Sequence, residues 1–480
     1  MISPAGAARF ALPAAVVASA LALAACLSVL GVGFDPHLDE HEGGASSGAP
    51  GAAEPGSSSG GPGGPGGPGA SDAGDAATFT VPPDFACNES WTSPTRSDAR
   101  CLARRSTVID ALLADTSAIT AVVVDSDNVV LAYNTRENMD EGELRIRNIK
   151  PNGPDAGADA PPTVIRRNFE DVGPAAKLAR GGSDATQTYL AYQELNSGDV
   201  VVVQRNATGF LSPPSFVASG FTSRISLDLA VSPAGDVAVV IGDRTRRKCL
   251  SYVRAAGSTT FAAPVMYSDW GVMDVAPSPG DVAVAFDGAG TEYALAHQPV
   301  GMASSRLQIV QITATGGSMA RTIDFVTLGG HAGISPSLGF VGAQRISSYF
   351  TQSNAGTARA DLRVSTFTSV DELPAISIVR QDIPVETPSR LTSSAVVDRF
   401  GLMHIAVIAP SPSGNGGLQW LRQYRDASGT RWLVDTVDDF VLTQGATDGA
   451  RVAIAVDDNR RPHIFYSAER TNTVRYATIY

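Results

Sequence analysis

Short apolar runs and polar breaks alternate along the chain from Thr120 to its end. The C-terminal part shows the pattern most clearly, with Val452–Val456, a polar turn opened by Asp457, a second run at His463–Tyr466 and a third at Val474–Thr478. Within such runs, β-branched and aromatic residues often alternate with polar ones. A period of two bounded by Asp, Asn, Gly and Pro is typical of half-buried strands joined by hairpin turns. The pattern predicts strand, turn, strand, turn and strand.

This pattern of three strands and two turns recurs seven times. The residue that opens its first turn returns at a nearly constant spacing of about 55 residues. These opening positions are Asp125, approximately Gly182, Ser232, Asp287, Val341, Asp398 and Asp457. A repeat of this length and content is typical of one blade of a β-propeller. We therefore predict an all-β fold, a seven-bladed β-propeller.

Each blade needs four strands. First strands are predicted at Ala121–Val124, Leu227–Val231, Val272–Val275, Ser394–Val397 and Val452–Val456. Fourth, outer strands are predicted at Thr163–Arg167, Arg321–Val326, Ala375–Val379 and Trp432–Val437.

The last repeat reaches Tyr480 without room for a fourth strand. The segment Ser106–Ala114, ahead of the first repeat, is similar to Trp432–Asp438. We predict that Thr107–Ala114 pairs with Val474–Ile479, which closes the ring and removes an unpaired edge. The Leu and Ala content of this segment also permits a short helix.

The sequence of the last blade, Val456-Asp-x-x-x-x-Pro-His-Ile-x-Tyr466, resembles blades of extracellular bacterial propellers of the sialidase-like (BNR-type) group. The resemblance covers Thr120 to Tyr480. It implies a glycoside hydrolase or lyase as one function class. However, the Asp-box Ser-x-Asp-x-Gly-x-x-Trp is missing from the sequence, and no local motif identifies catalytic residues. The catalytic residues, if any, stay unknown at this stage.

The N-terminus carries an export signal. Arg9 precedes an apolar stretch, Phe10–Phe34, which contains Leu23-Ala-Ala-Cys26. This motif resembles the lipobox of bacterial lipoproteins, which implies cleavage before Cys26 and lipidation of Cys26. Residues 1–25 are then a signal peptide. Because the apolar stretch continues past Cys26, an uncleaved signal anchor reaching about residue 34 is the alternative. Both alternatives export the rest of the chain.

A tether follows at residues 26–80, and the propeller occupies 81–480. From Gly43 to Thr78 the chain has no aromatic residue, Leu, Ile or Val. Such a composition cannot bury enough apolar surface to offset the entropy of ordering the backbone, so we predict a disordered linker.

The remaining cysteines fall into two groups. Cys87 and Cys101 bracket a short polar segment, and in an oxidising compartment we expect a disulfide between them. Cys249 lies in an apolar run and is expected to be a small buried side chain. The spacing matches no metal site, and we expect neither a metal nor a cofactor.

The net charge of −12 and the isoelectric point near 5.0 argue against nucleic acid as a partner. The basic cluster Arg244–Lys248 lies between two apolar runs and is expected to be a hairpin tip. The expected partners are a membrane, through the lipid anchor or an N-terminal helix, and a glycan or protein ligand at one face of the ring. The expected location is the extracytoplasmic side of a bacterial cell envelope, at the outer membrane or cell surface.

Two polar groups are candidate sites. Oxygen ligands cluster at Asp125–Asn128 and Asp457–Asn459, but neither has a calcium-loop layout, and both are expected to serve as hairpin turns. His404 and His463 follow their turn-opening aspartates by the same interval, and His297 is aligned with Tyr133, Tyr192 and Tyr466. Recurrence within the repeat favours structural roles for all three histidines.

Two functions stay open. The first is an exported, membrane-tethered propeller that acts as a binding or scaffold module. The alternative is a cell-surface glycoside hydrolase or lyase, which would need carboxylates facing each other across a sugar.

Overall fold

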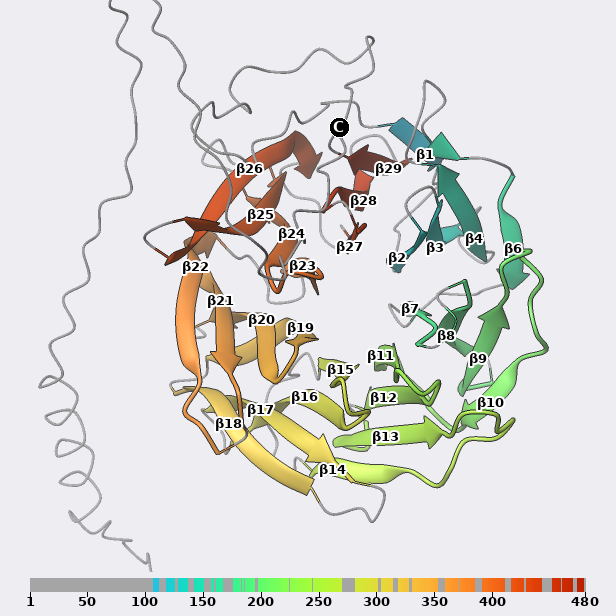
Figure 1. Ribbon diagram of the computed structural model, residues 1–480, viewed down its shortest axis with the longest axis horizontal. Coiled ribbons are helices and arrows are strands. Elements are labelled where there is room, and N and C mark those ends of the chain that lie inside the picture. Colours follow the sequence, from blue (N-terminus) through green and yellow to red (C-terminus); the bar gives the residue numbers. More distant parts are fainter. Residues whose placement is uncertain are drawn as a thin grey trace, which may run out of the picture. The chain divides into compact units, whose positions relative to one another are not determined.

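The structure is a computed structural model that describes residues 107–478, apart from segments between strands, the longest of which is 270–280. All regular elements among these residues are strands, and they form seven antiparallel sheets. The sheets are arranged around a common centre (Figure 1). The predicted seven-bladed β-propeller is confirmed.

We number the blades in chain order and describe each from the centre outwards. The inner strands of blades 1 to 7 are β2 (Ile119–Asp125), β7 (Ala176–Arg180), β11 (Ser226–Val231), β15 (Val282–Phe286), β19 (His331–Val341), β23 (Thr392–Val397) and β27 (Val452–Val456). The second strands are β3 (Asn128–Arg136), β8 (Thr188–Glu194), β12 (Val237–Asp243), β16 (Glu292–Pro299), β20 (Gln344–Gln352), β24 (Met403–Pro410) and β28 (Pro462–Ala468).

Two further layers complete the blades. The third strands are β4 (Gly142–Lys150), β9 (Asp199–Arg205), β13 (Lys248–Arg254), β17 (Ser305–Ile312), β21 (Arg359–Phe367), β25 (Gly416–Asp426) and β29 (Thr473–Thr478). The outer strands are the short pair β5 (Gly157–Ala158) and β6 (Thr163–Arg166), then β10 (Ser215–Ala218), β14 (Val265–Asp269), β18 (Ser318–Val326), β22 (Ala375–Pro384), β26 (Gly429–Leu442) and β1 (Thr107–Ala111).

The hydrophobic core lies between blades. Seven clusters of buried side chains are found among the described residues, and each joins two neighbouring blades. In β12, for example, Val239 packs towards blade 2 and Val240 towards blade 4. Both faces of a second strand are therefore buried, which explains why these strands are nearly continuous apolar runs.

The ring closes through the predicted segment, over Thr107–Ala111; residues 112–114 lie outside the described part of the chain. β1 pairs antiparallel with β29, with Thr107 opposite Tyr476 and Ala111 opposite Thr473. The helix alternative is wrong for Thr107–Ala111, which form a strand. The closing strand supplies the outer edge of blade 7, so residues from the two ends of the repeat region share one sheet.

Side chains of blade 1 hold the closing strand in place. Asp110 accepts hydrogen bonds from the Tyr133 hydroxyl at 2.6 Å and from the Arg145 guanidinium at 2.9 Å. Arg147 donates to the carbonyl of Ile109 at 2.7 Å. Blade 7 and blade 1 are thus joined by polar contacts as well as by a shared hydrophobic cluster.

A similar contact recurs at two other junctions. An outer-strand aspartate lies near a second-strand tyrosine of the next blade, and that tyrosine is opposite a third-strand arginine. The three sets are Asp110, Tyr133 and Arg145; Asp324, Tyr349 and Arg363; and Asp438, Tyr466 and Arg475.

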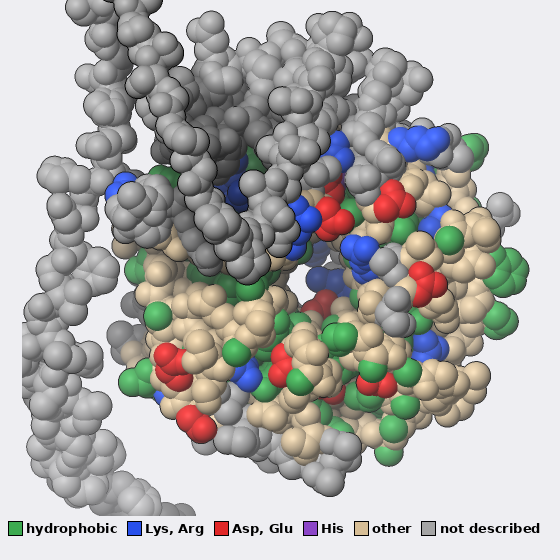
Figure 2. All heavy atoms as spheres, viewed as in Figure 1, with side chains coloured by type: hydrophobic (Ala, Val, Ile, Leu, Met, Phe, Trp, Pro, Cys, Tyr) green, Lys and Arg blue, Asp and Glu red, His purple; other side chains and the backbone are tan. Residues whose placement is uncertain are grey.

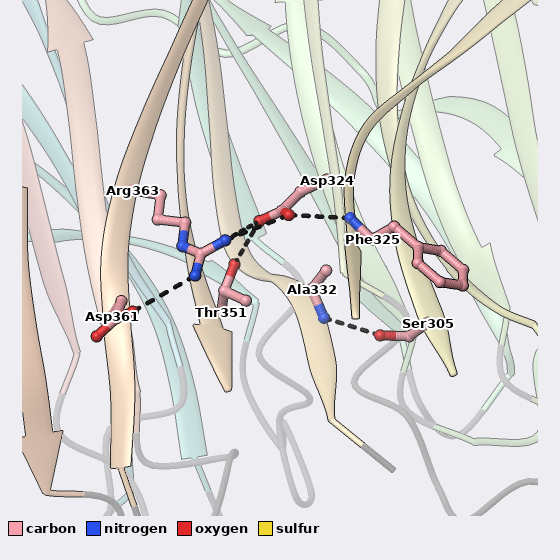
Figure 3. A network of polar contacts seen from close by, with 7 residues as sticks. All are labelled: Ser305, Asp324, Phe325, Ala332, Thr351, Asp361 and Arg363. Atoms are coloured by element: carbon pink, nitrogen blue, oxygen red, sulfur yellow. Dashed lines mark hydrogen bonds and ion pairs between the residues drawn. The ribbon is translucent and has the colours of Figure 1, made fainter. Parts of the chain in front are cut away.

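Figure 3 shows Asp324 and Arg363 of the second set from close by. Asp324 accepts hydrogen bonds from Arg363 at 3.0 Å and from Thr351 at 2.9 Å. Burial, and then the charge of Asp324, raises the pKa of Tyr349 well above its ordinary value. The tyrosine is therefore a neutral hydroxyl beside an ionised pair that ties blade 5 to blade 4.

One predicted strand lies outside the described residues. The run Val272–Val275 falls in the segment 270–280, and the inner strand of blade 4 is β15 instead. β15 ends at Phe286, directly before the turn-opening Asp287. The other inner strands proposed from the sequence coincide with observed strands.

Candidate functional site

The inner strands lie nearest the centre of the ring (Figure 1). Figure 2 shows a hollow there, with basic and acidic side chains around it. Ligands of ring-shaped folds commonly occupy such concave sites.

Small polar side chains in an inner strand, or in the case of Asp281 directly before one, accept hydrogen bonds from backbone amides of the next inner strand. The distances are 3.0 Å for Thr120 and Leu178, 3.2 Å for Ser226 and Val282, 2.8 Å for Asp228 and Val284, 2.8 Å for Asp281 and Ser335, 3.2 Å for Ser335 and Ser393, 3.3 Å for Ser337 and Ala395, and 3.3 Å for Ser394 and Ile454. An inner strand is a sheet edge, and an unpaired edge amide in a protein interior is costly. These side chains are engaged in holding the ring together.

An ion pair lies among them. Lys177 of β7 is 3.7 Å from Asp228 of β11. Burial raises the pKa of the Asp228 carboxyl, whereas Lys177 and the amide of Val284 act in the opposite direction. This carboxylate joins three blades, since it contacts β7 and β15 from β11.

The first turn of a blade, between its inner and second strands, is where the sequence placed its candidate oxygen ligands. In four blades the side chain of the opening residue accepts a hydrogen bond from the amide four residues later. The pairs are Ser232 with Asp236, Asp287 with Thr291, Asp398 with Leu402 and Asp457 with Arg461, at 2.8 to 2.9 Å. In blade 1, the side-chain amide of Asn128 donates to the Asp125 carboxylate at 2.8 Å. Hairpin-turn roles are confirmed for these residues.

His404 and His463 are buried beside these turns. His404 Nε2 lies 3.2 Å from Asp398, and His463 Nε2 lies 3.7 Å from Asp457. Burial lowers the pKa of both imidazoles, and the aspartates only partly oppose it. Both side chains are neutral parts of the blade interior, as the repeat predicted.

His297 is also buried, with Nδ1 at the carbonyl of Ala332 in the next blade. Its alignment with the blade tyrosines is wrong by one residue. The amide of His297 bonds to Asp281 just as Asn134 bonds to Ala118 and Ser467 to Arg451. His297 is the tenth residue after Asp287, as Ser467 is after Asp457, whereas Tyr466 is the ninth. The one-residue shift places His297 on the opposite face of its strand.

A second buried acid lies between blades 3 and 4. Glu292 of β16 is 5% exposed, and Ser251 of β13 donates a hydrogen bond to it at 2.5 Å. Burial raises the pKa of Glu292 to about 7, although the Ser251 hydrogen bond acts in the opposite direction. Tyr267 lies near this carboxyl and beside Cys249. The sequence showed no sign of this group, because its members are far apart along the chain.

Cys249 is completely buried in β13, as expected. Cys26, Cys87 and Cys101 lie outside the described residues, so the lipidation and the disulfide stay predictions. No helix in the described part of the chain is long and apolar enough to cross a membrane. Within the same residues, no three His, Cys, Asp or Glu side chains gather as metal ligands.

The first turns of blades 6 and 7 present an aromatic and basic surface. Phe400 is 50% exposed. The guanidinium carbon of Arg399 lies 4.7 Å from the centre of the Phe400 ring, and that of Arg460 lies 5.7 Å from it. We call Arg399, Phe400 and Arg460 the arginine–phenylalanine surface. Sequence reasoning missed it, because Arg460 comes from a different blade than its two neighbours.

Comparisons with known proteins give likenesses of fold. No protein-family model and no curated protein matches the chain. The BP39L lectin from Burkholderia pseudomallei is similar in structure, with 10% sequence identity, a TM-score of 0.48 and coverage of 77% of this chain and 98% of the lectin.

Two further solved structures are similar. Hydrazine synthase from Kuenenia stuttgartiensis has 12% identity and a TM-score of 0.45, over 78% of this chain and 96% of that chain. The Hadza microbial sialidase Hz136 has 10% identity and a TM-score of 0.39, over 70% of this chain and 73% of that chain. At these values a likeness does not carry over a function.

Proposed function

We propose that the protein is an exported, membrane-tethered propeller that acts as a binding or scaffold module on the extracytoplasmic side of a bacterial cell envelope. The observation that supports binding most strongly is that the polar side chains singled out from the sequence have structural roles. The aspartates and histidines singled out in the repeats are engaged in turns and blade contacts. The first turns, in contrast, display an exposed aromatic ring and guanidinium groups, which are typical of recognition surfaces.

Export and tethering are supported by the sequence. The lipobox-like Leu23-Ala-Ala-Cys26 precedes a long linker without large apolar residues. The propeller is also firmly closed on the side of the chain that follows the tether. β1 is the first described strand after the tether in sequence, and it is bonded on two sides, to β29 and to blade 1.

One preparation tests both parts of this proposal. The full chain is isolated from the membrane fraction of the producing bacterium, and its mature N-terminus is read by mass spectrometry. The same sample is then applied to a glycan array and to a panel of chromogenic glycosides. We expect a lipidated Cys26, binding to a defined set of ligands, and no turnover.

Three other results would change this proposal. An intact Met1 in the membrane fraction would replace lipidation with the signal anchor. Turnover of a glycoside would contradict the binding module and support the glycoside hydrolase or lyase. Lack of any bound glycan would direct the search to a protein ligand.

A further inference from the structure

The first turns of blades 3, 4, 6 and 7 share one backbone conformation. Their fourth residue donates its amide to the carbonyl of the opening residue and has a positive φ. In three blades this residue is a glycine, namely Gly235, Gly290 or Gly401, with φ between 81° and 98°. In blade 7 it is Arg460, with φ of 63°. A side chain in this region is strained relative to glycine, so Arg460 occupies a position that disfavours it.

The Arg460 side chain crosses to blade 6. Its Nε donates to Asp398 Oδ2 at 2.8 Å, and the Asp398 side chain is 1% exposed. Burial alone would raise the pKa of Asp398, but the hydrogen bonds from His404 and from the Leu402 amide hold it at about 2. The carboxylate is therefore ionised at all ordinary pH values. Arg460 is fixed by a permanent charge below the surface.

Phe400 lies between this fixed arginine and Arg399. Arg399 is exposed, stacks on the Phe400 ring and forms no ion pair with a described residue. A guanidinium that stacks on an aromatic ring keeps its in-plane N–H groups available, and their fork matches the two oxygens of a carboxylate or phosphate. The half-exposed Phe400 ring adds an apolar contact beside that fork.

The neighbouring first turns carry the opposite charge. Asp125, Asp184, Asp236 and Asp287 lie at the first turns of blades 1 to 4, exposed or half-buried. Asp458 lies next to the surface on the blade 7 turn. Arg180 of blade 2 is the exception among these turns. The carboxylates of blades 1 to 4 repel an anion that approaches this face, and the arginines of blades 6 and 7 attract it.

We propose that the arginine–phenylalanine surface is an oxyanion-binding site. Arg399 receives a carboxylate or phosphate group of the ligand, Phe400 contacts the apolar part next to that group, and Arg460 holds Phe400 in place from the neighbouring blade. The inference rests on the proposed binding function and names the chemistry that its ligand would carry. It does not depend on export.

Titration calorimetry of the purified full chain with benzoate, acetate and inorganic phosphate tests the site. Benzoate offers a carboxylate with an apolar ring, acetate offers the carboxylate almost alone, and phosphate offers the other oxyanion. We expect benzoate to bind several-fold more tightly than acetate. Arg399→Gln should weaken benzoate binding by at least about tenfold, as expected for the loss of a charge-assisted pair.

A matched control comes from blade 2. Arg180 is exposed at the end of β7, where the first turn of blade 2 begins. Arg180→Gln removes the same charge from the same kind of turn, and it should leave benzoate affinity unchanged. Thermal unfolding of both variants should match the parent chain, because both arginines are exposed.

Two further variants separate the roles of the neighbours. Phe400→Leu should reduce benzoate affinity to the level of acetate while acetate binding is kept. Arg460→Gly restores the residue found at this position in three other blades, so the turn should persist while benzoate binding weakens.

Equal benzoate affinity in Arg399→Gln and the parent chain would overturn the site, as would an equal loss in Arg180→Gln. Ligand capture on the array with no anion binding here would leave the binding module intact and place its site elsewhere. The two failures are therefore distinguishable.

Discussion

Replacing Asp324 with alanine is expected to lower the free energy of unfolding by about 3 kcal/mol, because it leaves a largely buried arginine without its main partner. Asp324 is 7% exposed and Arg363 has 20% of its side chain exposed. Thr351 would lose its acceptor as well. The partial exposure of Arg363 puts the expected loss at the lower end of values for buried pairs. Urea unfolding measures it.

Asp361→Ala is the matched control. Asp361 also pairs with Arg363, at 3.4 Å, but its side chain is 21% exposed and lies on the same strand as the arginine. We expect a loss of no more than about 1 kcal/mol for this longer contact within one strand. If both variants lose the same stability, the contact between blades 4 and 5 is not what stabilises the junction.

Stability is expected to fall as the pH rises from about 4.5 to about 7, through Glu292. Its pKa is raised from 4.5 in the unfolded chain to about 7 in the folded protein. A group with a raised folded pKa contributes stability that is fully present below the unfolded pKa and is lost as the pH rises through the folded pKa. The shift corresponds to about 3 kcal/mol, lost by pH 8.

Glu292→Gln tests this dependence. Glutamine has nearly the same shape, can accept the Ser251 hydrogen bond and stays neutral at every pH. The variant should match the parent chain near pH 4.5 and exceed its stability by about 3 kcal/mol at pH 8. The difference between two denaturant-unfolding series isolates Glu292, since other groups titrate equally in both. A difference that stays constant with pH would refute a buried, destabilising carboxylate.

The sequence was most informative about the features that recur in every blade. Every inner strand must bury one or both faces and end at a hairpin, so apolar runs before Asp398 and Asp457 were recognisable as β23 and β27. The closing strand was predictable by subtraction, because the last blade lacked an outer strand and Thr107–Ala111 matched an outer strand elsewhere.

The missed inner strand shows the limit of periodicity. Val272–Val275 and β15 are both short apolar runs, and local pattern cannot rank them. The distance to the turn decides: an inner strand must end directly before its hairpin, and only β15 reaches Asp287.

Contacts between blades were beyond sequence reasoning. Arg460 and Asp398 are 62 positions apart, and Asp324 and Arg363 are 39 apart. No periodic pattern specifies such pairs, because they depend on the angle between neighbouring sheets. One signal was available: an arginine stands in blade 7 at the turn position where three other blades have glycine.

Every junction described above depends on a ring that β1 closes. Hydrogen-exchange mass spectrometry of Thr473–Thr478 tests this directly in two truncated chains. With Met1–Thr78 removed, β29 should exchange as slowly as in the full chain. With Met1–Asp115 removed, it becomes a sheet edge and should exchange at least about tenfold faster. Equal protection of β29 in the two truncations would contradict closure by β1 and with it the seven-bladed ring.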